Sequence, residues 1–220
     1  MRLTFGSALE FFTFCLPATS QLSFHAYIMV SSSRFGALAQ VSLFAALVAV
    51  FGLIPKIDLP LGVPITLQTL GVMLAGCLLG PRRGFQALLL FLGAVAVGLP
   101  LLSGGRGGLG VFFVPSSGYL IGWPLGAAVT GLVMTVLPLG SPRRMAASAF
   151  LASAVGGLMT VHAFGVMGLV AIAGLSWTQA LLGTLVFVPG DLIKCGICAV
   201  VVHAVARGMP EWRFGRRALD

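Results

Sequence analysis

The sequence contains very few charged side chains, and acidic ones are the scarcest. Of 220 residues, 5 are Asp or Glu and 13 are Lys or Arg, so only 8% of the chain is charged. A soluble globular domain carries about 25%. A surface this poor in charge is not built to face water, which excludes an ordinary soluble domain. The 58% of hydrophobic residues and the mean hydropathy of +1.07 instead predict a membrane protein.

The shortage of acidic residues also argues against an enzyme. An intramembrane transferase needs a nucleophile or a metal-binding cluster of carboxylates and histidines near one membrane face. Only Asp191 lies inside an apolar segment, so no such cluster exists. No phosphate-binding glycine loop followed by lysine occurs either, which indicates that the chain does not hydrolyse ATP itself. An intramembrane enzyme is kept as a secondary alternative.

Cysteine is also scarce, and its positions do not suggest a disulfide framework. The four cysteines, Cys15, Cys77, Cys195 and Cys198, lie in or beside apolar segments. Cys195 and Cys198 share one helical face, but a metal or redox site would need further ligands, and only His203 is nearby. We therefore predict no metal site and interpret these cysteines as packing residues.

Long apolar segments predict an all-α membrane protein, a six-transmembrane-helix bundle. A spanning helix needs about 20 mostly apolar residues. The candidate segments are residues 37–54, 65–80, 84–99, 118–137, 146–173 and 189–206. The second and third are short, so we expect them to extend into their flanking turns.

The segment before Pro189 allows two interpretations. Residues 177–188 are apolar but too short to cross the membrane again, which favours an interfacial or re-entrant helix anchored by Trp177. The alternative is one long helix over residues 177–206, kinked at Pro189. Both interpretations give six crossings.

Basic residues lie in short loops between the apolar segments, a pattern that orients membrane proteins and argues against nucleic-acid binding. On one predicted side of the membrane, the loops contain only two basic residues, Lys56 and Arg106. The basic residues predicted for the other side are Arg34, Arg82, Arg83, Arg143, Arg144, Arg207, Arg213, Arg216 and Arg217. This asymmetry predicts that both termini are cytoplasmic and supports an even number of spans.

Three regions follow from this pattern. Residues 34–207 form the membrane domain, and residues 208–220 a basic cytoplasmic tail. Residues 1–33 are only moderately apolar and lack a convincing cleavage site, so they are interpreted as an N-terminal extension. We expect translation to start at Met29, and we assign no function to the residues before it.

Asp191 and Lys194 are the strongest indication of a site. They lie three residues apart in an otherwise apolar segment, so a helix places them on one face. Charges at such depth are usually paired, turned inward and functional. Without a ligand we expect the two to pair with each other, because an unpaired buried charge costs several kcal/mol. The alternative is an ion pair that only stabilises the start of the helix.

Several motifs resemble those of the BioY family, the biotin-binding S components of energy-coupling factor (ECF) transporters. The resemblance covers roughly residues 37–206 and keeps the expected order. Its motifs are Val63-Pro64-Ile65-Thr66-Leu67-Gln68-Thr69, Leu79-Gly80-Pro81-Arg82, Gly93 with Gly98-Leu99-Pro100, Pro115-Ser116-Ser117-Gly118-Tyr119-Leu120-Ile121-Gly122 and Pro189-Gly190-Asp191-Leu192-Ile193-Lys194.

The chain departs from the family at two places. It has Val114-Pro115-Ser116-Ser117-Gly118-Tyr119 where the family usually has Gly-Pro-Thr-Gly-Gly-Tyr, and residues 85–91 lack the tyrosine usual in the third span. Serine in place of threonine keeps a hydroxyl group. Substrate choice is the property on which these changes bear most.

The resemblance implies a six-helix bundle in the inner (plasma) membrane that binds biotin in an outward cavity, closed by the first and third outer loops. It implies an ECF transmembrane coupling subunit and ATPases as partners that energise uptake. In related S components a small-residue face of the first helix contacts the coupling subunit, and Ala45 and Ala49 match that pattern. An S component for another small vitamin or a metal is the first alternative.

Biotin offers a ureido ring, an apolar thioether ring and a carboxylate, and its site needs a few fixed polar groups in an apolar cavity. Lys194 can neutralise the carboxylate, and Asp191 can accept from a ureido N–H or hold Lys194. Thr66 and Gln68 are candidate ureido partners, with turn capping as the alternative. Tyr119 offers a ring face and a hydroxyl, with an interfacial anchor as the alternative.

Other polar residues are not assigned to the site. His162, midway along the fifth segment, is interpreted as a hydrogen-bonded packing residue, with participation in the site as the alternative. Lys56 and Asp58 are interpreted as solvated residues of the first outer loop. No cofactor is expected.

Overall fold

The computed structural model describes residues 18–56, 63–209, 212 and 214, and side chains from Phe35 onward. Most of the predicted extension 1–33, Asp58 and nearly all of the tail 208–220 therefore lie outside the described residues. The chain divides into two compact units, residues 1–39 and residues 40–220. The contacts discussed below all lie within the second unit.

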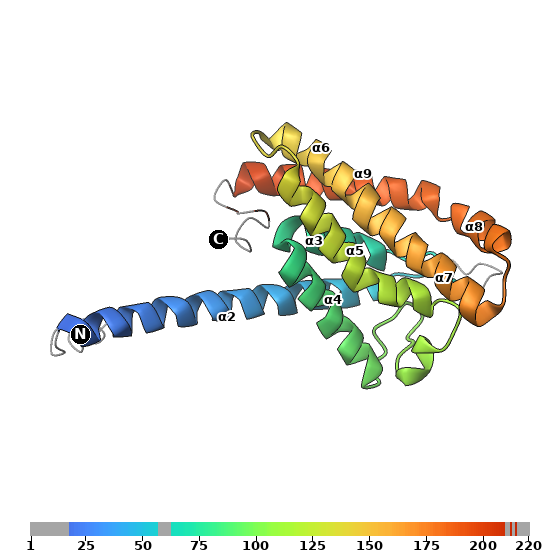
Figure 1. The fold of residues 1–220 in the computed structure, drawn as a ribbon, viewed down its shortest axis with the longest axis horizontal. Helices are drawn as coiled ribbons and strands as arrows, with labels where there is room; N and C mark the ends of the chain where they lie inside the picture. Colours follow the sequence, from blue (N-terminus) through green and yellow to red (C-terminus); the bar gives the residue numbers. More distant parts are fainter. Residues whose placement is uncertain (1–17, 57–62, 210–211, 213, 215–220) are drawn as a thin grey trace. The chain divides into compact units, whose positions relative to one another are not determined.

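The described part of the chain is helical, as predicted, apart from turns and one isolated bridge between Leu102 and Arg106. Helices α6, η2 and α7 run on without a break, and η2 is a π-helical segment inside them. The elements, labelled in Figure 1, are α2 (Ala18–Gly52), α3 (Gln68–Leu79), α4 (Pro81–Ala96), η1 (Leu109–Phe112), α5 (Ser117–Val136), α6 (Pro142–Ala152), η2 (Ser153–Thr160), α7 (Val161–Ala173), α8 (Trp177–Leu185) and α9 (Val188–Gly208).

Among the described residues, four helical segments are long and apolar enough to cross a membrane: Phe35–Gly52, Ser117–Val136, Pro142–Ala173 and Val188–Gly208. The expectation that the second and third segments extend into their flanking turns holds only at the start of the third, because α4 begins at Pro81, before residue 84, whereas α3 is shorter than residues 65–80. Gly80, with a φ of 81°, separates α3 from α4, and Pro81 begins α4. At 1.5 Å per residue the 12 residues of α3 span about 18 Å, less than the hydrocarbon core of about 30 Å.

Residues 177–208 form two helices rather than one kinked helix. Helix α8 begins with a capping box, in which the Ser176 hydroxyl accepts from the Gln179 amide and the Gln179 side chain accepts from the Ser176 amide. Helix α9 begins at Val188, and Pro189 lies in its first turn, where a missing N–H breaks no helical hydrogen bond. The single long helix is therefore excluded, and α9 begins just before Asp191.

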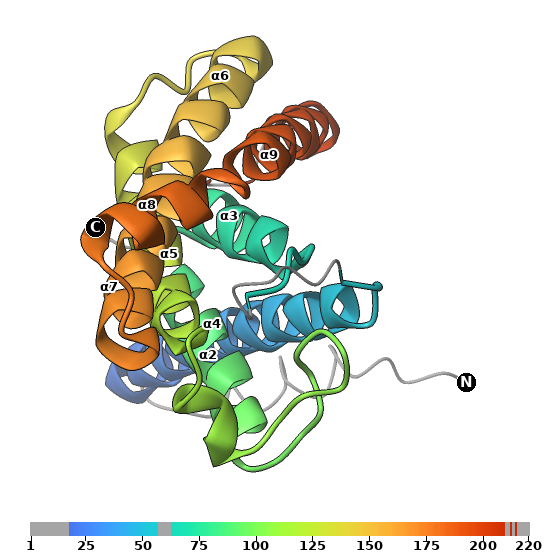
Figure 2. The ribbon, with the colours of Figure 1, turned by 90° about the vertical axis from the view of Figure 1, so that its right-hand side faces the viewer.

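Helix α3 lies at the centre of the second unit, between α9 and α5 (Figure 2). Every residue of α3 except Thr69 is buried. Glycines let the surrounding helices approach closely: a Cβ at Gly118 of α5 would lie 2.9 Å from the backbone of Gly168 in α7. This tight packing places parts of α3, α5, α7 and α9 around one cavity.

Candidate functional site

A cavity lies where the start of α3, the start of α5, the middle of the α6–α7 helix and the start of α9 meet. It is enclosed by apolar, aromatic and a few charged side chains. The lining residues are Val63, Pro64, Ile65, Thr66, Gln68, Thr69, Leu102, Arg106, Ser116, Tyr119, Leu120, Trp123, Val161, His162, Phe187, Asp191 and Lys194. All five predicted ligand-binding residues, Thr66, Gln68, Tyr119, Asp191 and Lys194, line this one cavity.

Asp191 and Lys194 form the ion pair that their spacing predicts. Lys194 Nζ lies 2.7 Å from Asp191 Oδ1, and both residues are buried, at 7% and 3% exposure. Lys194 Nζ also donates to Thr69 Oγ1 at 2.9 Å, and Thr69 donates in turn to Asp191 Oδ1 at 3.3 Å. The pair is thus held from two helices, α9 and α3, and faces a cavity instead of lipid.

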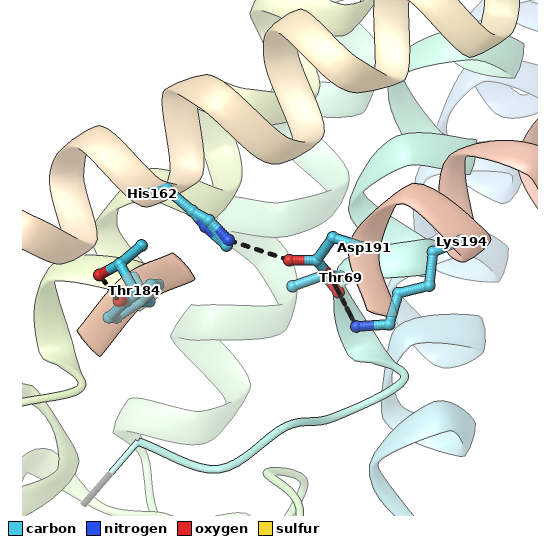
Figure 3. A network of polar contacts seen from close by, with 6 residues as sticks. Thr69, His162, Thr184, Asp191 and Lys194 are labelled. Carbon is cyan, nitrogen blue, oxygen red and sulfur yellow. Dashed lines mark hydrogen bonds and ion pairs between the residues drawn. The ribbon is translucent and has the colours of Figure 1, made fainter. Parts of the chain in front are cut away.

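His162 approaches the same carboxylate from α7 (Figure 3). Its Nε2 lies 2.9 Å from Asp191 Oδ2, and the residue lines the cavity. The structure therefore favours the alternative for His162, participation in the site, over a residue that only packs. The residue follows η2 by only two positions, and π-helical turns change the register of a helix and often occur at functional sites.

An aromatic wall stands beside the ion pair. The ring of Tyr119 meets His162 edge to face at 5.8 Å and Phe187 at 5.9 Å. Its hydroxyl lies 2.9 Å from Thr184 Oγ1 of α8, a contact also drawn in Figure 3. Tyr119 is only 7% exposed, which argues against an interfacial anchor. Helix α8 thus orients the tyrosine whose ring lines the cavity.

Both the nitrogen and the oxygen of the Gln68 side-chain amide form hydrogen bonds within the protein. Nε2 donates to the carbonyl oxygens of Val48 and Leu101, at 3.2 and 3.1 Å, and Oε1 accepts from the amide and hydroxyl of Ser103, each at 3.2 Å. Gln68 therefore ties α2 and the loop after α4 to the start of α3. In this arrangement it shapes the cavity wall.

The remaining predicted residues differ in accessibility. Thr66 lines the cavity and is half-buried. Ala45, predicted as a partner contact, is only 8% exposed because it packs in the core, whereas Ala49 is half-buried. The exposed residues on this stretch of α2 include Leu43 and Val50, at 66% and 55%.

Sequence reasoning missed Arg106, Trp123 and Thr69 as lining residues. Arg106 was assigned only to a loop, although its position in a glycine-rich outer loop signalled a basic group near the cavity.

Trp123 Nε1 is a buried donor without a hydrogen-bond partner. Buried polar groups are normally paired, so such a donor in a cavity wall is a candidate ligand contact. No sequence pattern distinguished Trp123 from an ordinary core tryptophan.

The three described cysteines lie deeper in the bundle. Cys198 Sγ of α9 donates to Cys77 Sγ of α3 at 3.8 Å, and Cys77 Sγ lies 3.7 Å from Ser153 Oγ. The described residues contain no cluster of three or more potential metal ligands. These thiols join α3, α9 and η2 as buried packing groups.

Comparison with known proteins agrees with this architecture. The model of the BioY family matches residues 23–211. This chain belongs to the BioY family. Similar curated proteins are the biotin transporter BioY of Rhizobium etli, 46% identical over 79% of this chain and 94% of that one, and that of Rhodobacter capsulatus, 44% identical over 80% and 96%.

A solved structure supports the fold of this BioY-family chain. It is a crystal structure of the S component for biotin from an ECF-type ABC transporter, which matches with a TM-score of 0.71 and 29% identity. The match covers 80% of this chain and 93% of the other. The relatives with curated names are transporters rather than enzymes.

Proposed function

We propose that this protein is a membrane-embedded biotin-binding S component that mediates biotin uptake. The observation that carries the proposal is the buried Asp191–Lys194 pair facing an aromatic cavity in a chain of the BioY family. A ligand of mixed character, with an apolar ring and polar groups at both ends, suits such a lining.

The charges of the lining favour a ligand with one negative charge. Arg106 and Lys194 contribute two positive charges and Asp191 one negative charge, so the lining carries one excess positive charge. Because Lys194 is already paired with Asp191, the excess resides on Arg106, whose side-chain Nε donates to the Ser103 carbonyl oxygen at 3.5 Å. We assign the biotin carboxylate to Arg106, and to Lys194 when the ion pair rearranges.

The ureido ring then belongs near Asp191, His162 and Trp123. A ureido group both donates and accepts, and this part of the lining supplies a carboxylate acceptor, the Trp123 N–H without a hydrogen-bond partner, and the His162 imidazole beside Asp191. Thr66 is a further hydroxyl partner, while Tyr119 and Phe187 cover the apolar ring. Gln68 positions the wall through its four hydrogen bonds.

The volume of the cavity requires that its walls move. It measures about 50 Å³, which is space for a few water molecules at about 10–15 Å³ each. Small-molecule pockets usually measure about 300–1,000 Å³. Biotin entry must therefore separate the lining side chains, and rearrangement of the Asp191–Lys194 pair is one way to couple binding to a change in the bundle.

The proposal includes six crossings of the inner (plasma) membrane with both termini in the cytoplasm. The short helices α3 and α4 supply the two crossings beyond the four long apolar segments, and the excess of arginine at the starts of α4 and α6 and the end of α9 marks the cytoplasmic side. An ECF coupling subunit and ATPases would energise uptake. Their contact would use the Ala45 and Ala49 face, of which Ala49 is the more accessible residue.

Biotin binding to the purified full chain tests the proposal, with Lys194→Ala and Asp191→Asn alongside. We expect nanomolar-to-micromolar binding that is lost in each variant, because each leaves the other group buried without its partner. Equal binding by both variants would remove these residues from the site. Binding of riboflavin or thiamine in place of biotin would indicate an S component for another vitamin.

A further inference from the structure

A second cavity lies at the opposite end of α9, where the start of α6 packs beside it (Figure 1). It measures about 360 Å³ and is lined by Ser141, Pro142, Arg143, His203 and Arg207. Nothing in the proposed biotin mechanism uses it. Its size lies within the usual range of small-molecule pockets.

The charges in this cavity are not balanced. Arg143 comes from α6, and His203 and Arg207 come from α9, and no carboxylate is among the residues of the described part of the chain that line the cavity. Neither arginine has an ion pair among the interactions that the structure describes, and both side chains are exposed. Two guanidinium groups and an imidazole donor converging from two helices form an arrangement that binds a phosphate group.

The cavity also lies at the ends of two apolar helical segments. The segment Pro142–Ala173 begins at this cavity and Val188–Gly208 ends there, and both are long enough to span a membrane. Arginines at the ends of such helices lie at the level of the lipid headgroups.

Apolar side chains follow each arginine toward the membrane interior. Phe150 is seven residues beyond Arg143, and Val200 is seven residues before Arg207, so each lies two turns away on the same helical face. Two turns correspond to about 10 Å along each helix. Phe150 is 36% and Val200 is 68% exposed, which leaves an apolar path for an acyl chain below the basic group.

We propose that Arg143, His203 and Arg207 bind the phosphate of an anionic phospholipid, with its acyl chain against Phe150 and Val200. The unbalanced positive charge favours phosphatidylglycerol or cardiolipin over phosphatidylcholine, because the choline cation of the latter would find no carboxylate in the lining. The lipid would join α6 to α9 at the end remote from the biotin cavity.

The test measures lipid retention by the full chain with native mass spectrometry, after reconstitution in nanodiscs containing equal amounts of phosphatidylglycerol and phosphatidylcholine. We expect preferential retention of phosphatidylglycerol, reduced about tenfold or more in the Arg143→Gln/Arg207→Gln double variant. Inorganic phosphate at millimolar concentration should not displace the lipid, since it has no acyl chain.

The chain supplies a matched control in Arg82. Pro81-Arg82-Arg83 begins α4 as Pro142-Arg143-Arg144 begins α6, and Arg82 is exposed but lines neither cavity. Arg82→Gln should leave lipid retention unchanged. The Arg143→Lys/Arg207→Lys variant keeps both charges and should retain part of the preference, so a loss in the glutamine variant cannot be ascribed to misfolding.

Three outcomes would overturn the lipid site. The first is equal retention of both lipids by the unmodified chain. The second is displacement by free inorganic phosphate, which would indicate a site for a soluble anion. The third is unchanged retention of phosphatidylglycerol in the glutamine variant. Biotin binding is measured separately in every variant, so failure of this proposal and failure of the biotin assignment are distinguishable.

Discussion

The first two turns of α9 carry Asp191 and Lys194, whereas its last turns carry His203 and Arg207. At the start of the helix the charges are buried, paired at 2.7 Å and supported by Thr69 from α3. At the other end Arg207 is exposed and His203 is half-buried, and the described residues that line their cavity include no carboxylate. The same helix therefore holds a neutral, enclosed ion pair at one end and an uncompensated positive cluster at the other.

This contrast shows why position along a membrane helix determines what a charge can do. A buried charge must be neutralised where it lies, because desolvation costs several kcal/mol, so it can respond to a small ligand only by exchanging partners. A charge at the helix end remains hydrated and is free to attract an anion from the surroundings. The experiments below test this distinction.

The largest effect is expected from breaking the ion pair. Lys194→Met should destabilise the protein by about 3–5 kcal/mol, since it leaves Asp191 buried without its main partner, and should weaken biotin binding at least about 100-fold. Thermal unfolding and isothermal titration measure the two effects.

The double variant Asp191→Asn/Lys194→Met separates stability from binding. It removes both charges, so most of the thermal stability that Lys194→Met loses should be restored, while biotin binding should stay weak. Recovery of both properties would show that the pair serves the fold alone.

Arg106 should have the next largest effect, and a selective one. Arg106→Gln is expected to weaken biotin binding by about 10–100-fold, the value of charge-assisted hydrogen bonds of about 1.5–3 kcal/mol. The amide derivative of biotin, which has no carboxylate, should bind the variant and the unmodified protein equally. If the variant binds biotin and its amide more weakly by the same factor, Arg106 acts on the cavity wall and the biotin carboxylate lies elsewhere.

Trp123→Phe removes one N–H and keeps an aromatic ring. If this donor reaches the ligand, biotin affinity should fall by about fivefold, in line with a hydrogen bond of about 1 kcal/mol. Thermal stability without biotin should not decrease, because the indole N–H has no partner in the structure. An unchanged affinity would exclude Trp123 from ligand binding.

The smallest effect is expected at the far end of α9. Arg207→Gln removes one cation from the same helix as Lys194→Met, yet biotin affinity should stay within about twofold, because distant sites without shared partners act independently. Titration of biotin into both variants makes the comparison. A large loss in Arg207→Gln would show that the two ends of α9 are energetically coupled.

The sequence by itself determined the membrane class, the helical architecture and the place of the ion pair. Composition excluded a soluble surface, and the spacing of Asp191 and Lys194 put both on one helical face, where the structure has them paired. The BioY motifs then indicated the family. These are local properties, because hydropathy and helical periodicity are fixed by neighbouring residues.

Only the tertiary structure decided which other side chains join that pair. His162, Trp123 and Arg106 come from α7, α5 and the loop after α4, and their separation in sequence conceals that they line one cavity. The four hydrogen bonds of Gln68 and the basic cavity between α6 and α9 likewise depend on long-range packing. Glycines that allow helices to touch set these distances, and no local pattern specifies which helices will meet.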